Sequence, residues 1–178
     1  MKKLLVLSLL PMMTLVGCAQ EPAAKLPNLD GDTYSVKITP ENSTLTADAL
    51  TSAKQVTLNS SEDETVQYTF EFSAGVRLNS SHNEFTMPNE TYLKSVSTYK
   101  VERIIVDYFY SKGTNFSVYA NTDHSGTALE AHASTITPTD PDDGGKVIEF
   151  NVNANGWSIY NSTVYKPSFY YIEIVFRK

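Results

Sequence analysis

The feature that most constrains this sequence is an alternation of apolar and polar residues with a period of two. From Glu102 to Tyr110, one set of alternate positions carries Ile104, Val106, Tyr108 and Tyr110. From Phe169 to Phe176, the corresponding set is Tyr170, Ile172, Ile174 and Phe176. Successive side chains of a β-strand point to opposite faces of its sheet, so this period predicts strands with one face buried.

Shorter segments of the same kind are separated by clusters of Asn, Ser, Gly and Asp, which favour turns. They are Tyr34–Ile38, Gln55–Leu58, Val66–Phe72, Val76–Leu78, Glu84–Thr86, Phe116–Ala120 and Val147–Val152. Many short strands at hairpin-like spacing predict an all-β protein, and we expect a single antiparallel β-sandwich.

The two longest strands also share a local sequence. Each follows a Tyr-Lys or Tyr-Lys-Pro segment that ends a hydroxyl-rich stretch, with the lysine at Lys100 or Lys166. Counted from each lysine, apolar or aromatic residues recur at every second position, and an acid, Asp107 or Glu173, occupies the same place. A repeat of this length is not a solenoid period. We interpret the two segments as equivalent strands of one sandwich.

The N-terminus predicts export. A basic start is followed by an apolar stretch from Leu4 to Gly17, which is shorter than the roughly 20 residues of a membrane-spanning helix. The stretch ends in Leu15-Val16-Gly17-Cys18, which resembles the bacterial lipobox. The resemblance implies cleavage before Cys18 and attachment of lipid to its thiol, anchoring the protein to a bacterial membrane on the extracytoplasmic side. The alternative is an ordinary secretory signal with a chance cysteine.

The expected domain organisation follows from this reading. Residues 1–17 would form the signal peptide, and 18–32 the lipidated cysteine with a flexible tether rich in proline and glycine. Residues 33–178 would form the β-sandwich. Because Cys18 is the single cysteine, the sandwich would contain no disulfide, cysteine nucleophile or cysteine metal site.

The strand layout also resembles a known group of modules. An extended Thr91-Tyr92-Leu93 precedes an Ile/Val-rich strand, a turn at Lys112-Gly113-Thr114, a strand ending Val118-Tyr119-Ala120, and a closing Ile-x-Ile strand. This order is similar to jelly-roll sandwiches of the galactose-binding-like fold. The resemblance implies that ligands could be sugars, held by end loops or by aromatic side chains on a sheet face, and that an acidic loop could hold a structural calcium ion. Fold alone does not confer these activities.

Other residues bear on the chemistry. The net charge of −6 and the absence of a basic cluster argue against nucleic-acid binding. The histidines, His82, His124 and His132, fall in polar segments without metal-ligand spacing, and we expect His124 in a solvated turn. The strand acids Asp107, Glu149 and Glu173 are expected to face solvent rather than to form a catalytic pair. The sequence therefore predicts a protein that is not an enzyme and has no cofactor.

An acidic turn is the one candidate metal site. Asp140, Asp142 and Asp143 supply the oxygen ligands that calcium prefers. Pro141 and the adjacent pair of aspartates break the alternating spacing of a calcium-binding loop, so a solvated hairpin turn is the alternative.

Aromatic residues are the candidate ligand contacts. Trp157 follows the turn signal Asn155-Gly156, Tyr160 lies three residues later, and Tyr119 ends a strand. Exposed rings could stack on sugars, whereas a buried Trp157 would instead plug one end of the core. We expect non-catalytic binding of an extracellular glycan or surface polymer. The alternatives are a structural or protein-interaction envelope lipoprotein, such as an adhesin or assembly subunit, and an unrecognised hydrolase.

Overall fold

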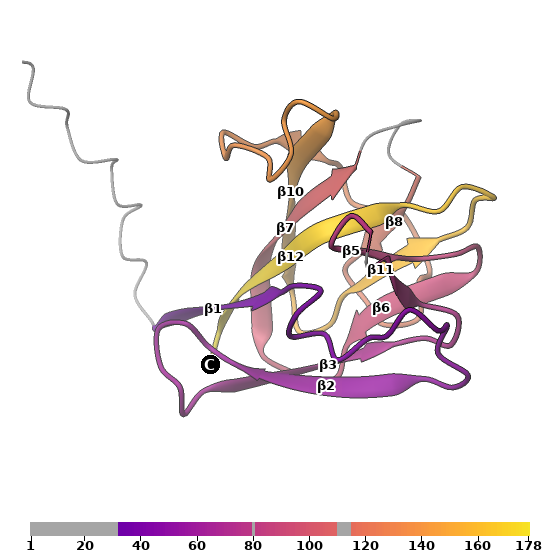
Figure 1. Ribbon diagram of the computed structural model, residues 1–178. Coiled ribbons are helices and arrows are strands. Elements are labelled where there is room, and N and C mark those ends of the chain that lie inside the picture. The colour runs from indigo at the N-terminus through magenta and orange to yellow at the C-terminus, as the bar shows by residue number, and fades with distance from the viewer. Residues whose placement is uncertain (1–31, 80, 110–114) are drawn as a thin grey trace, which may run out of the picture.

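The computed structural model describes residues 32–79, 81–109 and 115–178. All regular elements in this part of the chain are β-strands, and they form two sheets that pack face to face (Figure 1). Sheet A has seven strands in the order β4-β5-β12-β7-β10-β9, with β1 also paired to β12. Sheet B has five strands in the order β2-β3-β6-β11-β8. The predictions of an all-β chain and of an antiparallel β-sandwich are confirmed.

The strands of sheet A are β1 (Thr33–Ile38), β4 (Arg77–Asn79), β5 (Glu84–Thr86), β7 (Lys100–Phe109), β9 (His132–Ala133), β10 (Gly145–Ala154) and β12 (Ser168–Arg177). Those of sheet B are β2 (Lys54–Asn59), β3 (Gln67–Phe72), β6 (Thr91–Ser95), β8 (Ser117–Tyr119) and β11 (Ser158–Asn161). Sequence patterning did not predict β9 or β11 as strands. Both are short, and β11 has no clean alternation.

The related strands β7 and β12 lie side by side at the centre of sheet A. They are antiparallel, with Ile104 opposite Ile174 and Val106 opposite Ile172. The pairing register shifts between Phe169 and Tyr171. As a result, Tyr170 packs in a small cluster on the outer surface of sheet A instead of joining Ile172 in the main core, and its predicted side of the strand is wrong.

The main core fills the space between the two sheets. Its largest members are aromatic, including Trp157, Tyr68, Phe70 and Phe176, and each is almost fully buried. Rings meet in preferred geometries, as in the stack of Tyr99 on Phe176 with centroids 5.2 Å apart. Because inward positions are filled by this core, the outward positions of each sheet are left for other roles.

Hydrogen bonds to the carboxylate of Glu62 hold β1 in place. Glu62 accepts hydrogen bonds from the backbone N–H and the hydroxyl of Ser35 on β1, and from the hydroxyls of Ser60 and Ser61. Burial alone would raise the pKa of Glu62, but these hydrogen bonds lower it to about 2. The predicted signal peptide, Cys18 and most of the tether lie outside the described residues.

Candidate ligand-binding face

Trp157 is wrongly predicted as an exposed stacking platform. It immediately precedes β11, and its side chain is 0% exposed in the main core. The indole Nε1–H donates to the Tyr68 hydroxyl over 2.8 Å, which satisfies its polar group inside the sandwich. The alternative reading, in which Trp157 plugs the core, is the one that the structure shows.

Tyr160 and Tyr119, in contrast, point away from the core on neighbouring strands of sheet B. Their strand neighbours Ile159 and Val118 are fully buried, so the tyrosines occupy the outward positions of β11 and β8. Both are half-buried. Since Ser158 is opposite Tyr119, the two tyrosines are diagonal neighbours on one surface. Two of the three predicted ring contacts are thus brought to the same face.

Tyr92 on β6 extends this aromatic group. It lies directly opposite Tyr160 in the pairing of β6 with β11. The sequence prediction did not select Tyr92 as a ligand contact. The signal that could have found it is its alternation with Leu93, which is fully buried and so leaves Tyr92 on the outer side.

His124 bridges two of these rings. Its imidazole stacks on Tyr160 with centroids 4.8 Å apart and an interplanar angle of 2°, and it lies 5.0 Å from the ring of Tyr92. The expectation of a solvated turn residue is therefore wrong for the ring, although His124 does belong to a turn. Its φ of 60° is rare for a non-glycine residue. Burial, followed by the charge of Lys94, lowers its pKa, which favours the neutral imidazole.

Hydrogen bonds made by short side chains stabilise the turn around His124. Asn121 donates through its amide to the Ser125 carbonyl over 2.8 Å, and the Ser125 hydroxyl donates to Asp123 over 2.8 Å. These bonds lie within the turn, fix its shape and offset the unfavourable backbone of His124. The imidazole consequently covers one side of Tyr160 and also contacts the ring of Tyr92.

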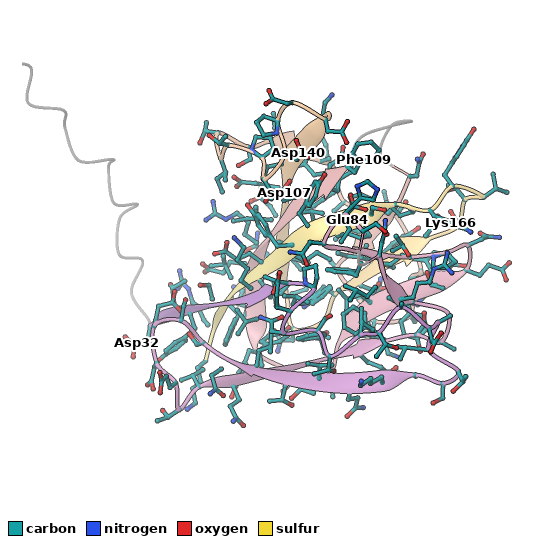
Figure 2. The ribbon with its side chains drawn as sticks, in the orientation of Figure 1. Asp32, Glu84, Asp107, Phe109, Asp140 and Lys166 are labelled. Carbon is teal, nitrogen blue, oxygen red and sulfur yellow. The ribbon has the colours of Figure 1, made fainter. Side chains whose placement is uncertain are left out.

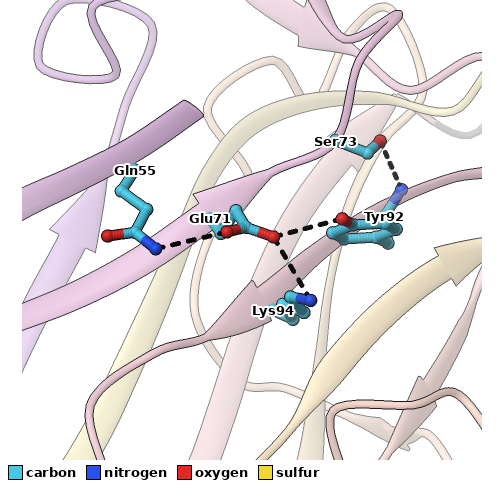
Figure 3. Close-up of polar contacts among 5 residues, drawn as sticks. All are labelled: Gln55, Glu71, Ser73, Tyr92 and Lys94. Carbon is cyan, nitrogen blue, oxygen red and sulfur yellow. Dashed lines mark hydrogen bonds and ion pairs between the residues drawn. The ribbon is translucent and has the colours of Figure 1, made fainter. Parts of the chain in front are cut away.

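A carboxylate-centred network lies beside the tyrosines (Figure 3). Glu71 on β3 accepts a hydrogen bond from the Tyr92 hydroxyl over 3.1 Å and from the Gln55 amide over 3.3 Å, and its Oε1 lies 3.2 Å from Lys94 Nζ. Lys94 Nζ is also 4.8 Å from the centroid of the Tyr92 ring. Burial would raise the pKa of Glu71, yet the bonds from Gln55, Lys94 and Tyr92 hold it below its ordinary value. The group is ionised at neutral pH.

The acidic turn makes hydrogen bonds of its own. Asp140 Oδ1 accepts from the backbone N–H of Asp143, and the Asp140 carbonyl accepts from the N–H of Gly145. A side chain at Gly145 would collide with that carbonyl, so glycine is required there. Asp142 is exposed. In the described part of the chain, no group of three or more His, Cys, Asp or Glu side chains is arranged to bind a metal ion.

Asp107 is the clearest departure among the strand acids. It is 0% exposed and lies at the same end of sheet A as Asp140 (Figure 2), so the expectation that it faces solvent is wrong. Its Oδ2 accepts from the backbone N–H and hydroxyl of Thr139, whereas Oδ1 is buried and has no hydrogen-bond partner among the described residues. Burial raises the pKa of this carboxyl, and the bonds from Thr139 oppose that shift only in part.

Comparison with known proteins adds no assignment to this geometry. No protein-family model matches the sequence, and no curated protein shows significant similarity to it. The residues that the structure describes contain no helix long and apolar enough to cross a membrane. The fold thus defines the chain as an antiparallel β-sandwich, and its function has to be argued from the surfaces of the two sheets.

Proposed function

We propose that this chain is a lipid-anchored bacterial surface protein whose sandwich binds an extracellular glycan or surface polymer without catalysis. The observation that supports it is the outer face of sheet B, where Tyr92, Tyr119 and Tyr160 gather beside the Gln55–Glu71–Lys94 network. Sugar rings present an apolar face and polar edges, so tyrosine rings flanked by amide and charged groups match them. The jelly-roll type and the galactose-binding-like relationship remain predictions.

The test is binding by the full chain, extracted from membranes in detergent, to an array of glycans and to soluble polysaccharides. We expect Tyr119→Ala to weaken binding about two- to thirteenfold, since a stacking ring contributes roughly 0.5–1.5 kcal/mol. Tyr165→Ala is the matched control, because Tyr165 is 45% exposed on the loop between β11 and β12. Absence of binding to every glycan, or equal losses for both variants, would reject this site.

The lipid anchor rests on the lipobox resemblance at Cys18. Cells fed a clickable palmitate analogue should label the wild-type protein, and Cys18→Ser should abolish the label and release the protein from the membrane fraction. An unlabelled wild-type protein would leave an ordinary secretory signal as the explanation. This outcome is independent of whether sheet B binds a glycan.

A protein-interaction role is the second candidate, and the loop between β11 and β12 favours it. Val164 is 81% exposed at the tip of this loop. Asn161, which is buried, donates to the carbonyls of Met87 and Tyr165 and accepts from the N–H and hydroxyl of Thr163, so the loop is held in one shape. A photo-crosslinker at Val164 should trap one discrete protein in the producing cells if this candidate is right.

A further inference from the structure

One row of side chains crosses the whole outer face of sheet B. Gln55, Glu71, Lys94, Ser158 and Tyr119 lie opposite one another in register on β2, β3, β6, β11 and β8. Strands are spaced about 4.8 Å apart, so the row spans roughly 19 Å. Ser158 is 0% exposed, so the part of the row that a ligand can reach is Gln55, Glu71 and Lys94, with Tyr119 beyond Ser158.

The charged side chains at the outward strand positions of this face form one compensated pair. Among the outward positions of the five strands, Glu71 and Lys94 are the two ionisable groups that carry charge at neutral pH, and they form an ion pair. The remaining outward positions carry amides, hydroxyls and tyrosine rings. The face therefore offers hydrogen bonds and ring surfaces with no net charge.

Glu71 links three neighbours within this row and beside it. It accepts from Gln55 on one side, from the Tyr92 hydroxyl on the other, and pairs with Lys94 (Figure 3). With a side chain only 17% exposed, the carboxylate lies beneath groups that a ligand would meet. Gln55 is exposed, and its amide is oriented by this contact.

We propose that Glu71 determines the specificity of this face by neutralising Lys94 and orienting Gln55 and Tyr92, so that the face selects uncharged polyhydroxylated chains over anionic ones. The inference rests on the proposed glycan-binding function. Hydroxyl groups of a neutral chain can both donate and accept, which matches the amide and tyrosine hydroxyl. An anionic chain would gain little from Lys94, because Glu71 already compensates its charge.

Removing the charge of Glu71 should reverse the preference. In Glu71→Gln, Lys94 becomes an uncompensated cation on the face, and Gln55 and Tyr92 exchange a charged acceptor for a single neutral amide oxygen that orients them more weakly. We expect binding to neutral polysaccharides to weaken about tenfold, which is the effect of losing one oriented hydrogen bond to a charged group. A new affinity for anionic polysaccharides should emerge and should decline as salt is added.

The experiment is affinity electrophoresis of the full chain in detergent, through gels containing dextran, mannan or hydroxyethyl cellulose as neutral probes, or alginate or hyaluronan as anionic probes. Wild type should be retarded by at least one neutral probe and by neither anionic probe. Glu71→Gln should reverse this pattern, and Glu71→Gln with Lys94→Gln should lose the anionic retardation. Circular dichroism and thermal unfolding of each variant check that the fold is retained.

The matched control is Glu149→Gln. Glu149 also pairs with a cation, Arg103, at 3.0 Å, but on the outer face of sheet A. Its loss should leave probe selectivity unchanged. Wild type that binds anionic probes as well as neutral ones, or a folded Glu71→Gln that keeps wild-type selectivity, would overturn the role of Glu71 alone. Wild type that binds no probe of either kind would overturn the glycan-binding function and this inference with it.

Discussion

The outer surfaces of sheets A and B arise from the same alternation of inward and outward side chains, but they carry different kinds of residues. On sheet A, the outward positions build a second small core, in which Ile105, Val147, Tyr170 and Tyr171 are buried. Charged residues surround this core, and Lys37 Nζ lies 3.5 Å from the centroid of the Tyr171 ring. On sheet B, the outward positions carry amides, hydroxyls, half-buried tyrosines and the single ion pair of Glu71 with Lys94.

This difference shows that the apolar–polar alternation determines which side chains point away from the main core. It does not determine what those side chains contact on the outer surface of each sheet. On sheet A, the segment between β9 and β10 lies against the outward side chain of Asp107, to which Thr139 ties it. Outward side chains on the β2 and β3 side of sheet B, such as Gln55 and Thr57, remain exposed. This contrast is the basis for proposing a stabilising role for the outer surface of sheet A and a binding role for that of sheet B.

Truncation of the small core should have the largest effect. Ile105→Ala on sheet A should lower the free energy of unfolding by about 2–4 kcal/mol, because it opens a cavity among buried side chains. Thr57→Ala, an outward truncation on sheet B, should cost less than about 1 kcal/mol, since it removes only an exposed hydroxyl contact with Thr69. Denaturant unfolding measures both, and equal losses would erase the contrast.

Loss of the hydrogen bonds to Glu62 should have an intermediate effect on the free energy of unfolding, with a defined pH dependence. Its pKa of about 2 lies below the ordinary value of 4.5, so its contribution is present above pH 4.5 and is lost as the pH falls toward 2. Because the carboxylate is largely open to solvent, Glu62→Gln should cost about 1–2 kcal/mol at neutral pH. Glu64→Gln, at an exposed neighbouring residue, is the control for thermal unfolding measured between pH 2 and pH 7.

Asp107 should give a smaller effect of opposite sign. Its pKa is raised by burial, so the folded state binds the proton more tightly than the unfolded state does. Stability should therefore rise as the pH is lowered from neutrality toward 3.8, the ordinary value for the group. In Asp107→Asn this rise should disappear, with little loss of stability at neutral pH. A melting temperature of the variant that follows the wild-type curve across this range would contradict the assignment.

The sequence predicted much of this architecture because a long strand repeats the alternation of inward apolar and outward residues several times. β7 and β12 carry a long alternation, and both lie, paired with each other, in sheet A of the sandwich. The register shift at Tyr170 was not predictable, since it depends on how β12 meets β7 and β5. The strand β11 was missed because four residues that include Ser158 give too short a pattern to distinguish from a loop.

The candidate site was only partly predictable for a related reason. Tyr119 and Tyr160 could be selected as exposed rings from their turns and strand ends, but the same rule placed Trp157 outside the core. Neither the contact of His124 with Tyr160 nor the links of Glu71 follow from spacing, because each joins residues distant in the sequence. Such contacts arise from the strand order of sheet B.

The most direct test of the central claim is hydroxyl-radical footprinting of the full chain in detergent, with and without the soluble neutral polysaccharide that binds best. The proposed binding role of sheet B predicts protection of Tyr92 and Tyr119 and unchanged labelling of Val164 and Tyr165 on the loop between β11 and β12. Protection confined to Val164 and Tyr165, with Tyr92 and Tyr119 labelled as before, would contradict the claim and transfer the binding role to that loop.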